Sequence, residues 1–315
     1  MNSLKYLFVI IDNDVPSFCF YSNHSTSKSV RMSLEMLKDI IFFAMKENLI
    51  VNFIVGKKPF SMEYMTEINK VHHIMISDAE SQLNDSDDIL VVYSGEALIK
   101  NRIRTKCNMT IRLDRRDLSN LALIYSNVEC NNRLNIHWGE IDKFTTDDFN
   151  TYQKQLKLIC DMYIENFKKG LYKEVNILTD RIILNKMNNC GAGDSHITFA
   201  PNGKFYICPG FYLDNDSPIG DLKSGLKLNN PQLYRLDHSP LCINCDAYQC
   251  RRCTYLNKRL TNEVNVPSHE QCVLAHLERN AGEYIYDALK EYHIPQFRSE
   301  IKKIDYLDPF DVLIK

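Results

Sequence analysis

Seven of the eleven cysteines lie between residues 190 and 272, and their spacing is typical of metal ligands. In order they are Cys190-x12-Gly-x4-Cys208, Cys242-x2-Cys245-x4-Cys250-x2-Cys253 and, eighteen residues later, Cys272. Thiolates must be deprotonated to bind a metal, and so many close together repel one another unless a cation is present. The pattern therefore predicts a metal centre.

Two kinds of metal centre fit these cysteines. A zinc site would use Cys242 to Cys253, but the four residues between its two pairs are fewer than the usual spacing of about 12 or more. Zinc also leaves Cys190, Cys208 and Cys272 without a role. Iron–sulfur clusters are larger, take cysteines from distant loops and interleave the ligands of two clusters. We therefore prefer clusters and keep zinc as the alternative.

Charge and hydropathy exclude several classes of protein. The chain has 38 Lys and Arg against 40 Asp and Glu, a formal net charge of −2, which gives no electrostatic case for nucleic acid or an anionic membrane as partner. The start, MNSLKYLFVIIDNDV, lacks the features of a signal peptide, and no segment reaches the ~18 apolar residues of a membrane span. We expect a cytoplasmic protein, whose thiols bind metal or react rather than form disulfides.

Short apolar runs alternate with amphipathic stretches up to about residue 185. The predicted strands are 5–11, 50–55, 72–76, 88–93, 109–113, 121–125, 134–137 and 175–178. The predicted helices are 28–48, 61–70 and 147–168. This alternation implies an α/β fold with parallel strands and right-handed crossovers.

The composition changes after residue 185, where Cys, Gly, Asn and Pro become frequent. The stretch HITFAPNGKFYIC predicts a hairpin with Asn202-Gly203 in its turn. A second module therefore begins near 186 and runs to about 280, followed by a helix at about 281–293 and a tail.

The cysteine pattern resembles that of the SPASM domain, the auxiliary-cluster extension of radical SAM peptide-modifying enzymes. The family pattern is Cys-x(9–15)-Gly-x4-Cys, a gap, Cys-x2-Cys-x5-Cys-x3-Cys, a gap and a final Cys; this chain has x4 and x2 in place of x5 and x3. The interleaving in that family implies that auxiliary cluster II is held by Cys242, Cys245, Cys250 and Cys272. It implies that auxiliary cluster I is held by Cys190, Cys208 and Cys253.

Auxiliary cluster I then lacks an identified fourth protein ligand. Either it has an open iron where a substrate thiolate binds, or only one [4Fe–4S] cluster assembles.

The stretch DNDVPSFCFY, residues 12–21, resembles the loop after the first barrel strand of radical SAM enzymes. That loop carries Cys-x3-Cys-x-aromatic-Cys and holds the cluster that cleaves SAM. Phe18 and Cys19 match its end, but Asp12 and Pro16 stand where the other two cysteines belong. One thiolate cannot hold that cluster, so SAM is not expected as a cofactor.

A second motif is altered in the same way. Radical SAM enzymes carry Gly-Gly-Glu-Pro-Leu after the second strand, and the glutamate receives the methionine ammonium of SAM. This chain has GKKPF at 56–60, with Lys58 at the glutamate position, where a cation repels that ammonium. SGEAL at 94–98 looks closer to the motif but follows a later strand.

Both halves together resemble the family called CXXX repeat peptide maturases, which lack the usual SAM-cluster cysteines. The resemblance implies a radical-SAM-like partial (β/α) barrel at 1–185, a SPASM-like auxiliary-cluster domain at 186–280 and a C-terminal helix and tail at 281–315. It also implies post-translational maturation of a ribosomally synthesised cysteine-repeat peptide (RiPP), with one or two [4Fe–4S] clusters and a short precursor peptide as partner.

Two other functions stay open. One is a non-catalytic pseudoenzyme that presents peptide to an active radical SAM enzyme, a second maturation protein; the altered SAM loop favours it. The other is a zinc-stabilised binding protein. Seven metal-type cysteines favour the maturase, because a scaffold could use a packed core instead. Whether the chain is an enzyme stays open, and no catalytic residue is predicted.

Five further residues lie among or near the predicted ligands. Arg251 and Arg252 are expected to offset the negative charge of thiolate-ligated clusters. Asp246 and Tyr248 are expected to be loop residues between the ligands with no role in contacting substrate. His276 shares a helix face with Cys272 but is expected to be a surface residue.

Overall fold

The computed structural model describes residues 4–21, 30–81, 88–105, 108–130, 133–292, 294–298, 300–301 and 303–304. Its strands are β1 (Tyr6–Ile10), β2 (Ile50–Val55), β3 (His73–Asp78), β4 (Ile89–Ser94), β5 (Ile103–Thr105), β6 (Asn108–Leu113), β7 (Val128–Cys130), β8 (Arg133–Trp138), β9 (Glu174–Val175), β10 (His196–Phe199), β11 (Lys204–Tyr206), β12 (Gly220–Asp221) and β13 (Gly225–Leu226). Its α-helices are α1 (Leu34–Lys46), α2 (Met62–Ile68), α3 (Gly95–Lys100), α4 (Leu121–Ser126), α5 (Thr146–Lys168), α6 (Asn176–Ile183), α7 (Pro209–Leu213), α8 (Thr254–Thr261) and α9 (His269–Leu289). Short 3₁₀ turns are η1 (Arg115–Asn120), η2 (Ile141–Lys143), η3 (Pro231–Tyr234), η4 (Leu236–His238) and η5 (Lys290–Tyr292).

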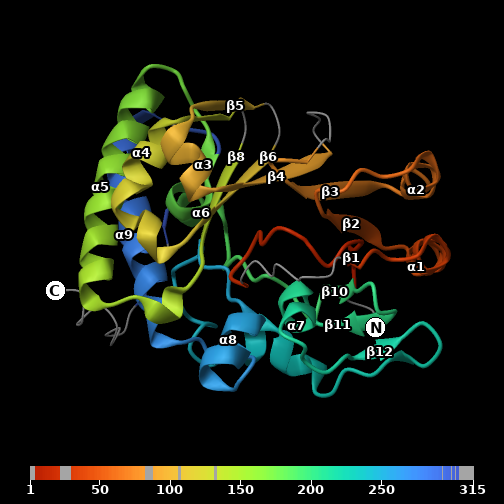
Figure 1. Cartoon of the computed structure of the whole chain (residues 1–315). Coiled ribbons are helices and arrows are strands. Elements are labelled where there is room, and N and C mark those ends of the chain that lie inside the picture. The colour runs from red at the N-terminus through yellow and green to blue at the C-terminus, as the bar shows by residue number, and fades with distance from the viewer. Residues whose placement is uncertain are drawn as a thin grey trace.

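In the part of the chain that the structure describes, one large sheet runs in the order β13-β12-β11-β10-β1-β2-β3-β4-β6-β8-β9. Neighbouring strands from β10 to β9 are parallel, and those from β10 to β13 are antiparallel. The predicted α/β class with parallel strands is confirmed. Figure 1 shows the sheet at the centre of the molecule with helices around it.

The central strands are apolar because both of their faces are covered. In β1, Leu7, Val9 and Ile10 are fully buried, and β2 buries Val51 and Phe53 to the same extent. Parallel strands that are covered on both faces are near-continuous apolar runs, and such runs predicted both β1 and β2 from the sequence. Burying each such side chain contributes roughly 1.5–3 kcal/mol.

Helices α5 and α9 lie side by side along one side of the sheet (Figure 1). Helix α5 begins at a capping box, in which Thr145 and Asp148 exchange side-chain-to-backbone hydrogen bonds. Helix α1 begins at Leu34 because the Ser33 hydroxyl accepts the N–H of Met36 at 3.2 Å. The helix predicted at 28–48 is therefore shorter, and the first of those residues lie outside the described part.

The predicted hairpin is confirmed, with β10 and β11 antiparallel and Gly203 in the turn at φ +77°. Strand β10 also pairs with β1 in parallel, Tyr6 opposite His196. The sheet thus continues across residue 185, where the boundary between two domains stays a prediction.

Three predicted elements differ from the structure. The strand predicted at 121–125 is helix α4, and the one predicted at 175–178 is mostly the start of α6. Periodicity does not distinguish such short apolar runs from buried helical turns. The helix predicted from 281 begins at His269, because Ser268 caps it with a hydrogen bond of 3.3 Å to a backbone N–H. The other predicted strands agree to within two residues.

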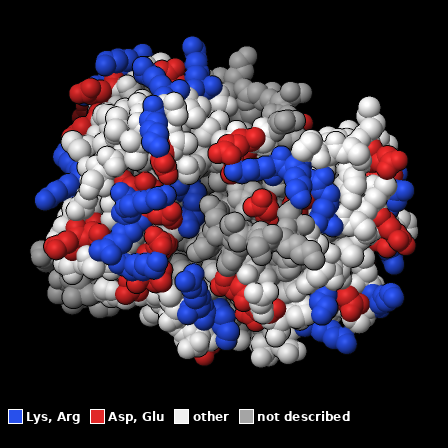
Figure 2. Space-filling view, viewed as in Figure 1, with Lys and Arg blue, Asp and Glu red and all other residues white. Residues whose placement is uncertain are grey.

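Charges of both signs are interspersed over the face seen in Figure 2, in line with the net charge of −2. Among the helices of the described residues, none has the length and apolar character needed to cross a membrane.

Candidate functional site

The structure gathers the seven predicted cysteines into two groups and adds an eighth, Cys19, to the first. Group I is Cys19, Cys190, Cys208 and Cys253. Group II is Cys242, Cys245, Cys250 and Cys272. Burial raises the pKa of Cys253 and Cys250 well above the usual range, and the charges of their group partners raise it further. Apart from Cys19, the two memberships are the ligand sets implied by the SPASM resemblance; that they hold clusters stays a prediction.

Three turns of the second module carry the predicted thiols of group I. After Cys190 the chain turns through Gly191 at φ +74°, and the N–H of Ala192 lies 3.5 Å from the Cys190 sulfur. Cys208 and Cys253 occupy the N-cap positions of α7 and α8, and the Cys253 sulfur accepts the N–H of Leu256 at 3.5 Å. Such donors favour the thiolate and tune the potential of a cluster.

Group II lies on the loop before α8 and on the first turn of α9. The Cys245 sulfur accepts the N–H of Ala247 at 3.4 Å and lies 3.9 Å from Nε2 of His276. Cys272 and His276 stand one turn apart on α9, as expected. The expectation of a surface histidine is wrong, because α9 begins before Cys272 and buries His276 to 3% exposure.

Cys250 and Cys253 belong to different groups although only two residues separate them. Those two residues are Arg251 and Arg252. The charge of Arg251 lowers the pKa of Cys19, and that of Arg252 lowers the pKa of Cys242, against the larger effect of burial. Arg251 therefore acts on group I and Arg252 on group II, and their role in offsetting the charge of bound clusters stays a prediction.

Asp246 is not a loop residue without a role, because it is buried and forms two ion pairs. Its carboxylate is 5% exposed and receives Nη2 of Arg181 and Nη1 of Arg279, each at 3.2 Å. Tyr248 lies beneath the guanidinium groups of Arg181 and Arg298, at 5.4 and 5.5 Å from the ring centroid. Asp246 and Tyr248 therefore fasten the group II loop to α6 and α9.

An ion pair between Asp12 and Arg31 ties the loop after β1 to the residues that follow β2. The buried carboxylate of Asp12 accepts hydrogen bonds from Arg31 at 2.8 and 3.2 Å and from the N–H of Gly56 at 3.2 Å. Arg31 also donates to the carbonyl oxygens of Lys58 and Pro59 at 2.8 and 2.9 Å. Bidentate pairing of this kind fixes both loops.

Glu96 of the SGEAL stretch lies elsewhere. It is exposed on α3 and pairs with Lys100 of the same helix at 2.7 Å.

A small cavity of about 30 Å³ lies between the first module and the cysteine-rich module. Its wall includes Phe20, which follows Cys19, and Cys250 of group II. In the described residues, Oε1 of Gln249 and both amide atoms of Gln271 face no hydrogen-bond partner although they are buried. An unpaired buried amide costs about 1–3 kcal/mol, so these side chains fit a site that receives a further polar group.

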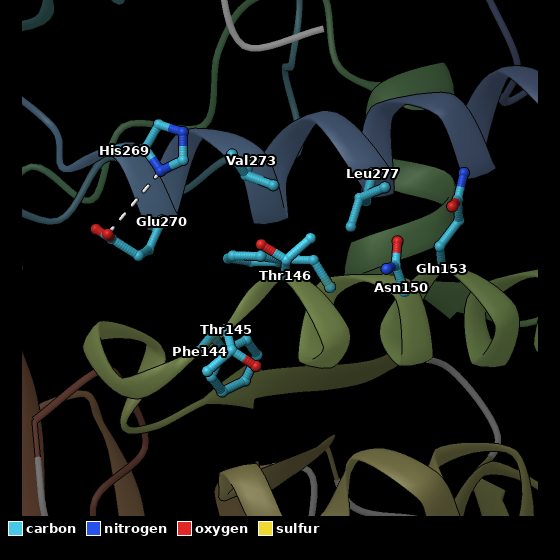
Figure 3. Close-up of a pocket in the computed structure, with 10 residues that line it drawn as sticks. Phe144, Thr145, Thr146, Asn150, Gln153, His269, Glu270, Val273 and Leu277 are labelled. Carbon is cyan, nitrogen blue, oxygen red and sulfur yellow. Dashed lines mark ion pairs between the residues drawn. The ribbon is translucent and has the colours of Figure 1, made fainter. Parts of the chain in front are cut away.

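A larger cavity of about 430 Å³ opens between the first turns of α5 and α9 (Figure 3). His269, Val273 and Leu277 line it from α9, and Phe144 and Phe149 line it near the start of α5. His269, Val273 and Leu277 repeat every four positions and so share one face of α9. No cysteine of group II lines the cavity, which is therefore beside group II and not part of it.

Among the described residues, no set of three or more His, Cys, Asp or Glu side chains is placed to hold a single metal ion. A cluster is larger than one ion and takes thiolates that stand further apart. The donor set of each group, four cysteines with backbone N–H donors and a nearby arginine, fits a cluster.

No protein-family model matches the chain, and no curated protein matches it in sequence. A solved structure does match in fold: anSMEcpe with bound AdoMet, at a TM-score of 0.60 over 91% of this chain and 99% of that chain, with 14% identity. The chain shares the fold of anSMEcpe. Two further anSMEcpe structures, with AdoMet and the peptides Cp18Cys or Kp18Cys, match at TM-scores of 0.55 and 0.56 over 92% and 91% of this chain, each at 13% identity and 97% of that chain.

Proposed function

We propose that this protein takes part in the maturation of a ribosomally synthesised cysteine-repeat peptide, with [4Fe–4S] clusters held by group I and group II. The observation that carries the proposal is the convergence of eight cysteines into two groups of four. Support also comes from the fold, which is shared with a protein solved with AdoMet and peptides. Bound clusters would supply one-electron transfer, and a cytoplasmic location would keep their thiol ligands reduced.

The residues of this chain have separate roles in the proposal. The thiols of both groups bind the clusters, the backbone N–H groups of Ala192 and Leu256 stabilise the thiolates of Cys190 and Cys253, and Arg251 and Arg252 offset their charge. Oε1 of Gln249 and the amide of Gln271 line the cavity beside Cys250 and have no hydrogen-bond partner among the described residues. The precursor peptide is the proposed partner.

A second candidate is the non-catalytic partner that presents peptide to an active radical SAM enzyme. The Asp12–Arg31 ion pair favours it, since a salt bridge occupies the first cysteine position of the SAM loop and ties it to the loop that contains Lys58. Both candidates require peptide binding, and they differ in where the reaction occurs.

One experiment separates them. The anaerobically purified protein is incubated with dithionite, SAM and a synthetic peptide of CXXX repeats, with and without an active radical SAM maturase, and the peptide mass is measured. A mass change with this protein alone, lost in Cys245→Ala and kept in Cys160→Ala, supports the maturase. A change that needs both proteins supports the presenting partner. An unchanged peptide in every mixture contradicts both candidates.

A further inference from the structure

We propose that Cys19 is the fourth protein ligand of the cluster held by Cys190, Cys208 and Cys253. The inference rests on the iron–sulfur part of the proposed function and names the side chain that completes group I. The sequence pattern left this position open, and Cys19 belongs to the other module, more than 170 residues before Cys190.

The loop after β1 folds back over the sheet and brings Cys19 toward β10. The ring of Phe18 stacks on Phe8 of β1 at 5.8 Å, and Phe8 meets His196 of β10 at 4.9 Å. His196 stands directly after the turn that Cys190 begins. Cys19, next to Phe18, is therefore held near the Cys190 turn.

Contacts on the other side of Cys19 lead to the remaining two thiols. Tyr21 meets Tyr255 of α8 edge-on at 6.5 Å, and Tyr255 meets Phe211 of α7 at 5.9 Å. Tyr255 follows Cys253 by two residues, and Phe211 follows Cys208 by three. A Cβ at Gly210 would lie 2.7 Å from the Tyr255 ring, so only glycine permits this approach of the two helices.

The loop is also fixed by its own hydrogen bonds. The Ser17 hydroxyl lies within hydrogen-bond reach of the carbonyl oxygens of Cys19, at 3.2 Å, and of Tyr21. The Tyr21 phenol donates to the carbonyl oxygen of Pro16 at 3.2 Å. The position of Cys19 is thus set by the fold of the loop.

Charge supports a ligand at this position. Arg251 lies beside the loop, since its Nη1 is 3.2 Å from Nε2 of His137, whose ring meets Phe20 edge-on at 6.1 Å. Arg112 is 7% exposed and reaches the loop, with Nε 3.4 Å from the Ser17 hydroxyl. Cationic groups of this kind offset the charge of a cluster with four thiolate ligands.

The alternative reading is a buried thiol that acts as a small apolar side chain. That reading does not explain why the loop is held against the Cys190 turn and the starts of α7 and α8, which carry the other three thiols. With Cys19 as ligand, four cysteines close the coordination of group I. The iron of this cluster is then not open to a substrate thiolate.

The test compares anaerobically reconstituted full-length variants by iron and sulfide content and by EPR. Cys19→Ala should lose iron to the same extent as Cys253→Ala, and on mild oxidation both should show the EPR signal of a three-iron cluster. Cys160→Ala removes another buried thiol, outside both groups, and should match the wild type. The double variant Cys19→Ala/Cys253→Ala should lose no more than one cluster.

Cys19→Ser keeps the size of the side chain, so it separates the loss of a thiolate ligand from the loss of packing that Cys19→Ala also causes. If Cys19→Ala and Cys19→Ser both keep the iron content and EPR spectra of the wild type, the proposal is overturned. Loss of iron in Cys19→Ala with no modified peptide would support the ligand and contradict only the maturation function. A wild-type protein without iron would overturn both.

Discussion

The phenol of Tyr152 on α5 donates a hydrogen bond of 2.7 Å to Oε1 of Glu278 on α9, and both side chains are buried. Burial raises the pKa of Glu278 to about 8, well above its ordinary value of 4.5. The charge of Glu278 also raises the pKa of Cys250, so the carboxyl lies close to group II. Glu278 therefore connects α5 with α9 and lies close to the thiols of group II.

We expect this carboxyl to make stability depend on pH. The Glu278 carboxyl binds its proton more tightly in the folded state than in the unfolded state. The stabilisation that this carboxyl contributes to the folded state is therefore fully present below about pH 4.5 and is lost as the pH rises through about 8. Each pKa unit is about 1.4 kcal/mol, which makes the total on the order of a few kcal/mol. Glu278→Gln should flatten this dependence in urea unfolding of the holoprotein between pH 6 and 9. Glu165→Gln, an exposed change on α5, should leave the slope as it is; an unchanged slope in Glu278→Gln would contradict the assignment.

Asp246→Asn should destabilise the protein severely. The change removes the buried carboxylate with which Arg181 and Arg279 both pair, and breaking a buried ion pair costs about 3–5 kcal/mol. Thermal unfolding measures the loss. Glu96→Gln, which breaks the exposed pair with Lys100, should have no measurable effect. Equal melting temperatures for the two variants would show that Asp246 does not fasten the group II loop.

Cys245→Ala should lower both iron content and stability, since a structural metal contributes folding free energy directly. Anaerobically purified wild-type protein should hold acid-labile sulfide and more iron than one four-iron cluster accounts for. Cys160→Ala is the matched control, a buried thiol whose sulfur lies 3.7 Å from the carbonyl oxygen of Ala281. A stable chain with one zinc and no sulfide would favour the zinc alternative instead.

The reconstituted protein should form no 5′-deoxyadenosine from SAM under dithionite. Asp12 is paired with Arg31, and Pro16 has no side-chain ligand. The double variant Asp12→Cys/Pro16→Cys should stay inactive, because Lys58 still replaces the glutamate and Arg31 would have lost its carboxylate. Product above the control without protein would mean that SAM binds elsewhere in this chain.

The resemblance to the SPASM pattern implied the same sets of thiols that lie together in the structure, apart from Cys19, and their role as cluster ligands stays a prediction. Cys19 could not be assigned to group I from spacing, because its position depends on how the loop folds back against Phe8 and Tyr255. The apolar runs likewise predicted most strands of the sheet. Their order, with β10 beside β1, is a tertiary property.

The burial of His276 and Gln271 was missed for a different reason. Both depend on the start of α9, which was placed too late. A signal was present, since Ser268 and Gln271 form the S-x-x-Q pattern of a helix start, and Ser268 does cap the helix.

Cys250 and Cys253 also limit how far apart two clusters can be. Three residue steps span at most about 10 Å between their Cα atoms, even in a fully extended chain. Two clusters bound to these residues would be near neighbours, so their unpaired spins would interact and an added electron would exchange between them. Their EPR spectrum would then differ from the sum of two isolated clusters, and the pair would store two electrons as one unit.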